Sequence, residues 1–401
     1  MKYAVGSLFA GVGGVCLGFK NAVVEDKSYQ LLWANEMDEY AASTYRCNFN
    51  HRLVVGDIEK IIKQSRCKNE EEIKLYREKQ NQILERPISI LTAGFPCQAF
   101  SIAGRQKGFD DHRGNLFWSV IDLVMLHYEK HGYKPRVLFL ENVKNLKGHD
   151  DGNTYRIIKK ELEKAGYIVK EAVLNTMDYT NIPQNRERIF IVCFLNKEDA
   201  NRFTLFDRDK NGRYLSLLNY RITFTDEDRI NQIENIIERT ESKGEMKKYY
   251  YTKKKFPHYF LSEDEYMKID KKSRKAVRIN LNEQILESNK FYQLRRGMYV
   301  RQNKNNVCPT LTASMGKGGH NVPLIKLNNG IRKLTPEETF RLQGFPVKDK
   351  GIPLIQGGDR YILPTHYKKR RFSDSRLYIQ AGNAVTVPII TLIASEILKV
   401  L

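Results

Sequence analysis

The first two hundred residues alternate short β-branched runs with amphipathic stretches, and this alternation constrains the fold more than any other feature of the chain. Helix-period segments such as Leu116–His127 and Tyr155–Lys164 lie between several of the runs. Strand-like runs occupy Tyr3–Phe9, Leu31–Ala34, Leu53–Val55, Ile88–Thr92, Val137–Leu140, Ile168–Leu174 and Ile189–Phe194. The pattern predicts an α/β fold, a mostly parallel sheet with helices on both faces.

The chain has 401 residues, which favours two domains over one. The strand–helix alternation fades after residue 196, so we expect one domain over residues 1–196 and a smaller, irregular one over 197–330. Residues 59–86 are rich in charge and predict an exposed helical insertion. The segment 331–401 ends in an apolar helix over 384–401, which must pack on another part of the protein.

The charge balance points to a polyanionic partner. Lys and Arg number 67 against 47 Asp and Glu, a net charge of +20, and nucleic acid is the commonest cellular polyanion. The stretch Lys247–Arg278 interleaves basic and aromatic residues, a pattern suited to phosphate contacts and base stacking, although an ordinary charged surface explains it equally well. No run of 18 apolar residues predicts a membrane span, and the N-terminus lacks a signal-peptide pattern, so we expect a cytoplasmic protein.

Ligands of such sheets bind at the carboxyl ends of the strands. The first strand runs into the glycine-rich turn Phe9-Ala-Gly11-Val-Gly13-Gly14, but Cys16 stands where a nicotinamide fingerprint requires glycine. The turn therefore favours another nucleoside cofactor. Glu36 after the second strand suits a ribose hydroxyl pair, and Asp57 after the third can accept from an adenine amino group.

The next two strands deliver candidate reactive groups to the same edge. Cys97 follows the fourth strand and the rigid Pro96, a placement that fits a thiolate nucleophile. Glu141 follows the fifth strand and is a candidate acid or hydrogen-bond donor. Arg186 and Arg188, two apart before a later strand, are expected to share one face and hold a carboxylate, a phosphate or a carbonyl oxygen. The six cysteines show no zinc-type spacing.

These motifs, taken in order, resemble those of the DNA (cytosine-5)-methyltransferase family of bacterial restriction–modification systems. Apart from the insertion at 59–86, only about residues 197–305 lie outside the resemblance. It is carried by Phe9-Ala-Gly-Val-Gly-Gly14, Gly94-Phe-Pro-Cys-Gln98, Glu141-Asn-Val143, Gln184-Asn-Arg-Glu-Arg188, Arg332-Lys-Leu-Thr-Pro-Glu-Glu, Arg341-Leu-Gln-Gly-Phe-Pro346 and Gly382-Asn-Ala-Val385.

The resemblance implies S-adenosylmethionine as cofactor, S-adenosylhomocysteine as product and no metal. It implies that Cys97 attacks C6 of cytosine, that Glu141 contacts N3 and the exocyclic amine, and that Arg186 and Arg188 hold the O2 side, with Pro96 and Gln98 adjoining. The implied cofactor contacts are Phe9, Gly11, Gly13, Gly14, Glu36, Met37, Asp57, Ile58, Pro96, Leu116, Asn383 and Val385.

The resemblance also implies double-stranded DNA as partner, with the target cytosine flipped out of the helix. Residues 197–330 would be the target-recognition domain, and 331–401 would return its last helix to the catalytic domain over 1–196. A cognate restriction endonuclease and a monomeric state are further expectations. The implied DNA contacts are Ser101, Arg105, Gly316, Lys317, Gly318 and Gly319.

Three other functions remain open at this point. A tRNA cytosine-C5 methyltransferase would share the same catalytic residues, but a separate recognition region favours duplex DNA. A DNA-binding protein without catalysis is disfavoured because Cys97, Glu141, Arg186 and Arg188 are all present. A nicotinamide dehydrogenase leaves Pro96-Cys97 unexplained.

Overall fold

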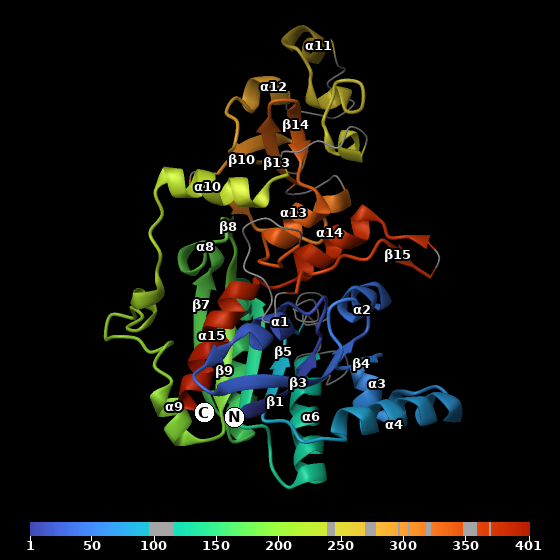
Figure 1. The fold of residues 1–401 in the computed structure, drawn as a ribbon, viewed down its shortest axis with the longest axis vertical. Coiled ribbons are helices and arrows are strands. Elements are labelled where there is room, and N and C mark those ends of the chain that lie inside the picture. The colour runs from blue at the N-terminus through green and yellow to red at the C-terminus, as the bar shows by residue number, and fades with distance from the viewer. Residues whose placement is uncertain are drawn as a thin grey trace. The chain divides into compact units, whose positions relative to one another are not determined.

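The computed structural model describes residues 1–95, 116–238, 245–268, 278–295, 297–303, 305–317, 322–347, 359–368 and 370–401. The chain forms two compact units that interleave in sequence (Figure 1). The sheet unit comprises Met1–Asn175, Glu187–Arg221 and Val387–Leu401, and the second unit comprises Thr176–Arg186 and Ile222–Thr386. Residues 197–221 thus stay with the sheet unit, and 331–386 with the second. The functional division into a catalytic domain and a recognition domain stays a prediction.

The sheet unit confirms the predicted α/β fold. All seven predicted strands are present, and the strand order is β2-β3-β1-β5-β6-β9-β7, with β4 also paired to β3. Its elements are β1 (Lys2–Leu8), α1 (Gly14–Asn21), β2 (Val23–Val24), β3 (Lys27–Glu36), α2 (Glu39–Arg46), β4 (Arg52–Val55), α3 (Ile58–Ile62), α4 (Glu70–Leu84), β5 (Ile90–Ala93), α6 (Leu116–His131), β6 (Val137–Val143), α7 (Asn153–Lys164), β7 (Ile168–Asn175), β9 (Glu187–Phe194), α9 (Lys197–Arg202) and α15 (Val387–Val400).

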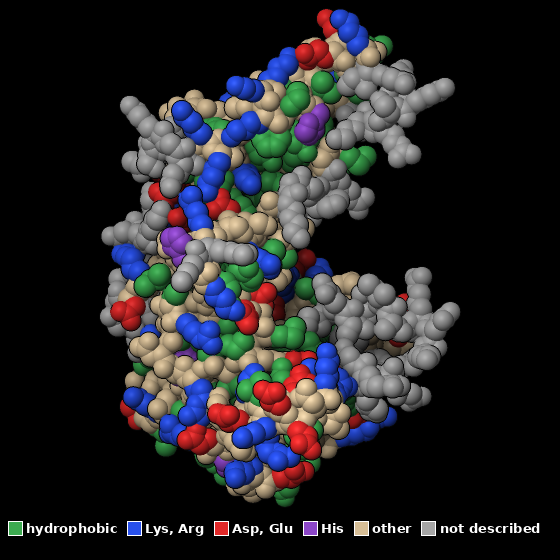
Figure 2. All heavy atoms as spheres, turned by 90° about the vertical axis from the view of Figure 1, so that its right-hand side faces the viewer, with side chains coloured by type: hydrophobic (Ala, Val, Ile, Leu, Met, Phe, Trp, Pro, Cys, Tyr) green, Lys and Arg blue, Asp and Glu red, His purple; other side chains and the backbone are tan. Residues whose placement is uncertain are grey.

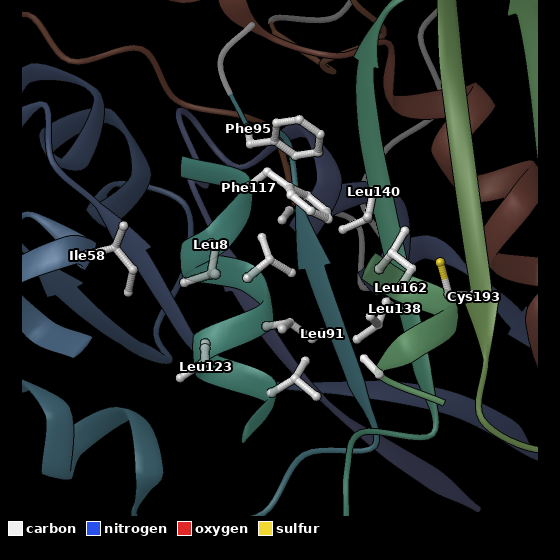
Figure 3. Packing of buried hydrophobic residues seen from close by; sticks show 14 of the residues in the cluster. Leu8, Ile58, Leu91, Phe95, Phe117, Leu123, Leu138, Leu140, Leu162 and Cys193 are labelled. Atoms are coloured by element: carbon white, nitrogen blue, oxygen red, sulfur yellow. The ribbon is translucent and has the colours of Figure 1, made fainter. Parts of the chain in front are cut away.

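The alternation of side chains along β6 shows why helices cover both faces of this sheet. Leu138 and Leu140 join an apolar cluster with residues of α6 and α7, as Figure 3 shows. Phe139, between them, points to the opposite face, where its ring lies 5.3 Å from that of Phe19 in α1. The strands β1, β3, β4, β5 and β6 pair in parallel, whereas β9 runs antiparallel to both β6 and β7.

The apolar C-terminal helix α15 packs against α1. A Cβ added to Gly18 would lie 2.5 Å from Ile390, so only glycine permits this approach. Tyr29 Oη in β3 also donates to the Ala394 carbonyl (2.8 Å). The stretch Asp374–Val400 is long and apolar enough to cross a membrane by length and composition alone, but two thirds of its most apolar window is buried inside the protein. Burial of this extent is typical of a helix that packs in a protein core.

The second unit is built around an antiparallel sheet with strand order β11-β10-β13-β14. The motif at Arg332 stabilises the second unit. Thr335 caps α13, and the Glu338 carboxylate accepts hydrogen bonds from Thr335 N and from the fully buried Arg332 guanidinium. The unit contains α8 (Thr176–Tyr179), β8 (Gln184–Asn185), α10 (Asp226–Ile236), α11 (Glu263–Met267), α12 (Leu281–Gln284), β10 (Phe291–Arg295), β11 (Tyr299–Gln302), β12 (Cys308–Pro309), β13 (Val322–Leu327), β14 (Gly330–Lys333), α13 (Pro336–Arg341), β15 (His366–Tyr367), β16 (Arg370–Arg371) and α14 (Asp374–Asn383).

Candidate active site

The turn between β1 and α1 needs glycine at two positions. Gly11 and Gly13 both have positive φ, 56° and 88°, a conformation that side chains rarely adopt. A Cβ on Gly13 would also lie 2.3 Å from the Phe49 ring, whereas one on Gly11 would meet nothing within 4 Å. Gly14 then begins α1. The open side of Gly11 leaves room for a ligand to approach the backbone closely.

Glu36 closes this turn from β3. Its Oε2 accepts from Gly11 N (2.7 Å), and its Oε1 accepts from Met37 N and Asp38 N (2.8 Å each). Burial raises the pKa of the Glu36 carboxyl, although these hydrogen bonds oppose the shift. The structure therefore holds a half-buried carboxylate at the point where the sequence predicts the ribose contact.

The other predicted cofactor residues of the sheet unit differ in exposure. Asp57 follows β4 and caps α3 by accepting from Glu59 N (3.0 Å). Met37 is exposed, Ile58 is buried in the apolar core, and Leu116 packs partly against that core. Phe9 lies in the turn itself with a positive φ of 55°.

Glu141 and Arg188 form a largely buried ion pair at the same edge. Arg188 Nε lies 3.1 Å from Glu141 Oε1, and the two side chains are only 15% and 10% exposed. Burial lowers the pKa of the Arg188 guanidinium, and the Glu141 charge opposes the shift. A Cβ added to Gly94, which follows β5, would lie 3.6 Å from Glu141 Oε2. The carboxylate thus lies beside the backbone that leads directly to Cys97.

Asn142 is a site residue that our reading of the sequence did not assign. Its Nδ2 donates to the Phe95 carbonyl (2.9 Å), and its Oδ1 accepts from Val143 N (2.8 Å). Phe95 is itself buried, with its ring 5.7 Å from that of Phe117. Asn142 therefore fixes the end of β5 just before Pro96, and its place in the Glu141-Asn-Val143 motif was the signal available for it.

Arg186 does not accompany Arg188. It belongs to the second unit, where its buried guanidinium donates to the carbonyls of Leu311 (3.0 Å), Gly382 (3.1 Å) and Ala384 (2.6 Å). The two arginines thus have different partners, since Arg186 ties segments of its own unit together and Arg188 pairs with Glu141. The expectation that they share one face stays a prediction. A contact between Arg186 and the base stays a prediction.

The remaining predicted residues of the second unit have packing roles of their own. A Cβ added to Gly316 would lie 2.7 Å from the Tyr378 side chain, so glycine allows α14 to approach. Asn383 ends α14, and Val385 is buried just beyond it.

Some predicted site residues lie outside the described part of the chain, namely Pro96, Cys97, Gln98, Ser101, Arg105, Gly318 and Gly319, together with the side chain of Lys317.

The five described cysteines offer no activated thiol. Burial raises the pKa of each of them, Cys16, Cys47, Cys67, Cys193 and Cys308, above the ordinary value for a thiol. Raised pKa values disfavour the thiolate that attacks an electrophile. Among the described residues, no group of three or more His, Cys, Asp and Glu side chains is arranged to hold a metal ion.

The fold and this edge fit a methyltransferase of the S-adenosylmethionine-dependent class, with carboxylates at the end of β3 and after β4 and a glycine turn after β1. The family model described as C-5 cytosine-specific DNA methylase matches residues 3–399. The chain belongs to this family and is a DNA cytosine-5 methyltransferase, which confirms the family predicted from the sequence. Membership implies S-adenosylmethionine as the methyl donor.

Curated relatives agree with this assignment, and a solved structure shares the fold. The type II methyltransferase M.Bsp6I of Bacillus sp. (strain RFL6) is 39% identical over 98% of both chains. M.HpaII of Haemophilus parainfluenzae is 31% identical over 99% of this chain and 90% of its own. The Dnmt2 methyltransferase of S. pombe shares the fold, with a TM-score of 0.60 at 15% identity, covering 98% of this chain and 97% of its own.

Proposed function

We propose that the protein is a site-specific methyltransferase that modifies C5 of a flipped-out cytosine in duplex DNA through a covalent bond between Cys97 and C6. The observation that carries the proposal is the Glu141–Arg188 ion pair beside Gly94. This pair sets the Glu141 carboxylate next to Gly94, three positions before Cys97 in the sequence, and pairs it with a guanidinium of the same unit. Full-length similarity to type II methyltransferases favours DNA over tRNA.

The edge of the sheet unit fits the cofactor. Gly11 leaves space against its backbone, and the carboxylates of Glu36 and Asp57 follow neighbouring parallel strands. When bound, S-adenosylmethionine supplies a methyl group from its sulfonium and leaves as S-adenosylhomocysteine. In the proposal Glu36 holds the ribose hydroxyls, Asp57 accepts from the adenine amino group, and the contacts of Phe9, Gly13, Gly14, Met37, Ile58, Pro96, Leu116, Asn383 and Val385 follow the family pattern. No metal takes part.

The residues of the chain act on the base in three stages. The Cys97 thiolate forms a bond to C6, and the electrons of the C5–C6 double bond make C5 nucleophilic. Glu141 contacts N3 and the exocyclic amine and stabilises the electron-rich ring, while Arg188 orients Glu141 and, with Arg186, holds the O2 side. After C5 gains its methyl group, a base or water removes the C5 proton, the double bond re-forms and Cys97 leaves as a thiolate.

The base must leave the duplex first, at a cost of a few kcal/mol. We propose that residues 197–330 recognise the target sequence and that Ser101, Arg105, Gly316, Lys317, Gly318 and Gly319 contact DNA, with Gln98 beside the vacated position. The protein would act as a monomer in the cytoplasm and protect the cell's DNA from a cognate restriction endonuclease. The related type II methyltransferases support this context.

A covalent trap tests the mechanism. Duplex DNA of mixed sequence that carries 5-fluorocytosine is incubated with the protein and S-adenosylmethionine and then denatured. Fluorine cannot leave C5 as a proton does, so the Cys97–C6 bond should persist and the complex should resist denaturation. Peptide mapping should place the DNA on Cys97.

The matched controls are Cys97→Ser, which should give no adduct, and Cys47→Ser, which removes an exposed thiol and should trap as the wild type does. An adduct with similarly substituted tRNA but none with DNA would replace the proposed substrate. Methylation of DNA without any trapped species would refute the covalent step alone.

A further inference from the structure

One face of the β10–β11 hairpin in the second unit is polar although its other face is apolar. Tyr292 and Leu294 point into an apolar cluster with Leu324 of β13. Gln293 and Arg295 alternate with them and therefore point to the opposite face. The antiparallel register sets Arg301 of β11 directly opposite Gln293, so its side chain lies on the same face as the other two.

These three side chains line a cavity of about 240 Å³ that lies wholly within the second unit. The remaining walls come from β8 and from the segment through β12. No acidic side chain contributes to the lining, which consists of Asn185, Gln293, Arg295, Arg301, Asn303, Pro309, Thr310 and Thr312.

Some polar side chains of this cavity are already bonded, since Asn303 and Thr310 donate to backbone carbonyls, but the side chains of Gln293, Arg295 and Arg301 have no hydrogen-bond partner within the described part of the chain. Arg295 Nε is buried without a hydrogen-bond partner there, and neither Arg295 nor Arg301 forms an ion pair with a described carboxylate. Gln293 is only 8% exposed, yet its side-chain amide has no partner among the described residues either. Buried polar groups of this kind are normally satisfied, so the arrangement points to a ligand rich in hydrogen-bond acceptors.

We propose that this cavity reads the edge of a guanine in the recognition sequence, with Arg295 as the residue that selects the base. A guanidinium presents two parallel donors that match O6 and N7 of guanine in the major groove. The Gln293 amide offers a donor and an acceptor to a neighbouring base, and the exposed Arg301 borders the rim. A backbone phosphate has only acceptors and would leave the amide acceptor unused. The inference rests on the proposed function and names residues that select the target of the same reaction.

The test compares base preference with overall affinity. Wild type, Arg295→Ala and Arg295→Lys methylate a library of randomised duplexes in the presence of S-adenosylmethionine, and sequencing of the modified cytosines gives the preference at each neighbouring position. Arg295→Ala should reduce the preference for guanine at one position about tenfold to a hundredfold. Arg295→Lys retains the charge but not the two parallel donors of the guanidinium, so it should lose the same preference. Lys130→Ala, which removes an exposed charge outside residues 197–330, should leave every preference unchanged.

Two results would overturn the inference. If Arg295→Ala weakens binding equally on all sequences and lowers the salt dependence by about one phosphate contact, the residue binds the backbone. If both Arg295 variants keep the wild-type preference at every position, the cavity does not read DNA. A wild type that methylates no cytosine at C5 would instead refute the proposed function. If Arg295→Ala folds but does not methylate DNA, its base preference is measured instead by equilibrium binding to the wild-type site and to single-base variants of that site.

Discussion

At the scale of single residues, Glu36 links two parts of the cofactor edge that are far apart in the sequence. One carboxylate oxygen accepts from Gly11 N in the turn after β1, and the other accepts from Met37 N and Asp38 N after β3. The carboxylate is thus already fixed in place before any ribose arrives. Such preorganisation lowers the entropy that a ligand loses in ordering the site.

We expect Glu36→Gln to weaken S-adenosylmethionine binding about tenfold to a hundredfold, because a hydrogen bond to a charged acceptor contributes about 1.5–3 kcal/mol. Affinity for DNA without cofactor should change less than about twofold, since the residue acts on the cofactor edge alone. Calorimetric titration of each ligand measures both effects. Glu25→Gln, an exposed carboxylate of the same unit, is the control. Equal losses of both affinities would contradict the assignment of Glu36.

At the scale of elements, one buried cluster joins α1, α2 and the start of β4 beneath the glycine turn. Tyr45 Oη of α2 donates to Cys16 Sγ of α1 (3.1 Å) and lies 2.6 Å from His51 Nε2. The Phe49 ring stacks on Tyr45 and lies against Gly13. Cys16, which breaks the nicotinamide fingerprint, is therefore part of the support for the turn.

This cluster predicts a loss of stability in mild acid. Burial and the nearby Lys20 lower the pKa of His51 to about 4, from an ordinary value near 6.5. Between these values the unfolded chain binds a proton that the folded chain does not, so stability is complete above about pH 6.5 and falls as the pH drops toward 4. His51 should thus cost the sheet unit about 2 kcal/mol of stability between about pH 7.5 and pH 5.

Denaturant unfolding of wild type and His51→Gln at the two pH values measures this difference. The variant should lose less stability on acidification, because glutamine does not titrate. His366→Gln, an exposed histidine of the second unit, should behave as the wild type does. If wild type and His51→Gln lose the same free energy of unfolding on acidification, groups other than His51 cause the acid sensitivity.

The sequence predicted the elements of the sheet unit better than their directions. All seven strands could be predicted because β-branched runs are typical of strands that are buried on both faces. A run of this kind does not indicate the direction of its strand, so it does not reveal that β9 is antiparallel to β6. The same limit applies to the site. Glu141 and Arg188 were found from their motifs, whereas the three backbone carbonyls that hold Arg186 come from residues more than a hundred positions away. Long-range hydrogen bonds of this kind leave no periodic signal in a sequence.

At the scale of the whole molecule, the net charge of +20 acts on the association with DNA more than on the fold. Figure 2 shows Lys and Arg side chains spread over the face drawn rather than gathered in one patch. A dispersed positive charge attracts the phosphate backbone at any sequence, so it should raise specific and non-specific affinity together. Selectivity must then come from a small number of base contacts within that background.

Binding to a cognate duplex should therefore fall steeply with salt, by about a thousandfold or more between about 50 mM and 200 mM, because each neutralised phosphate releases counterions. The slope should be nearly the same for a non-cognate duplex that retains the same backbone contacts. The ratio of the two affinities should then stay almost constant. Fluorescence anisotropy across a salt series, with the cofactor saturating throughout, measures both slopes. A flat dependence for the cognate duplex would mean that the excess of Lys and Arg does not face DNA, and the charge would need another explanation.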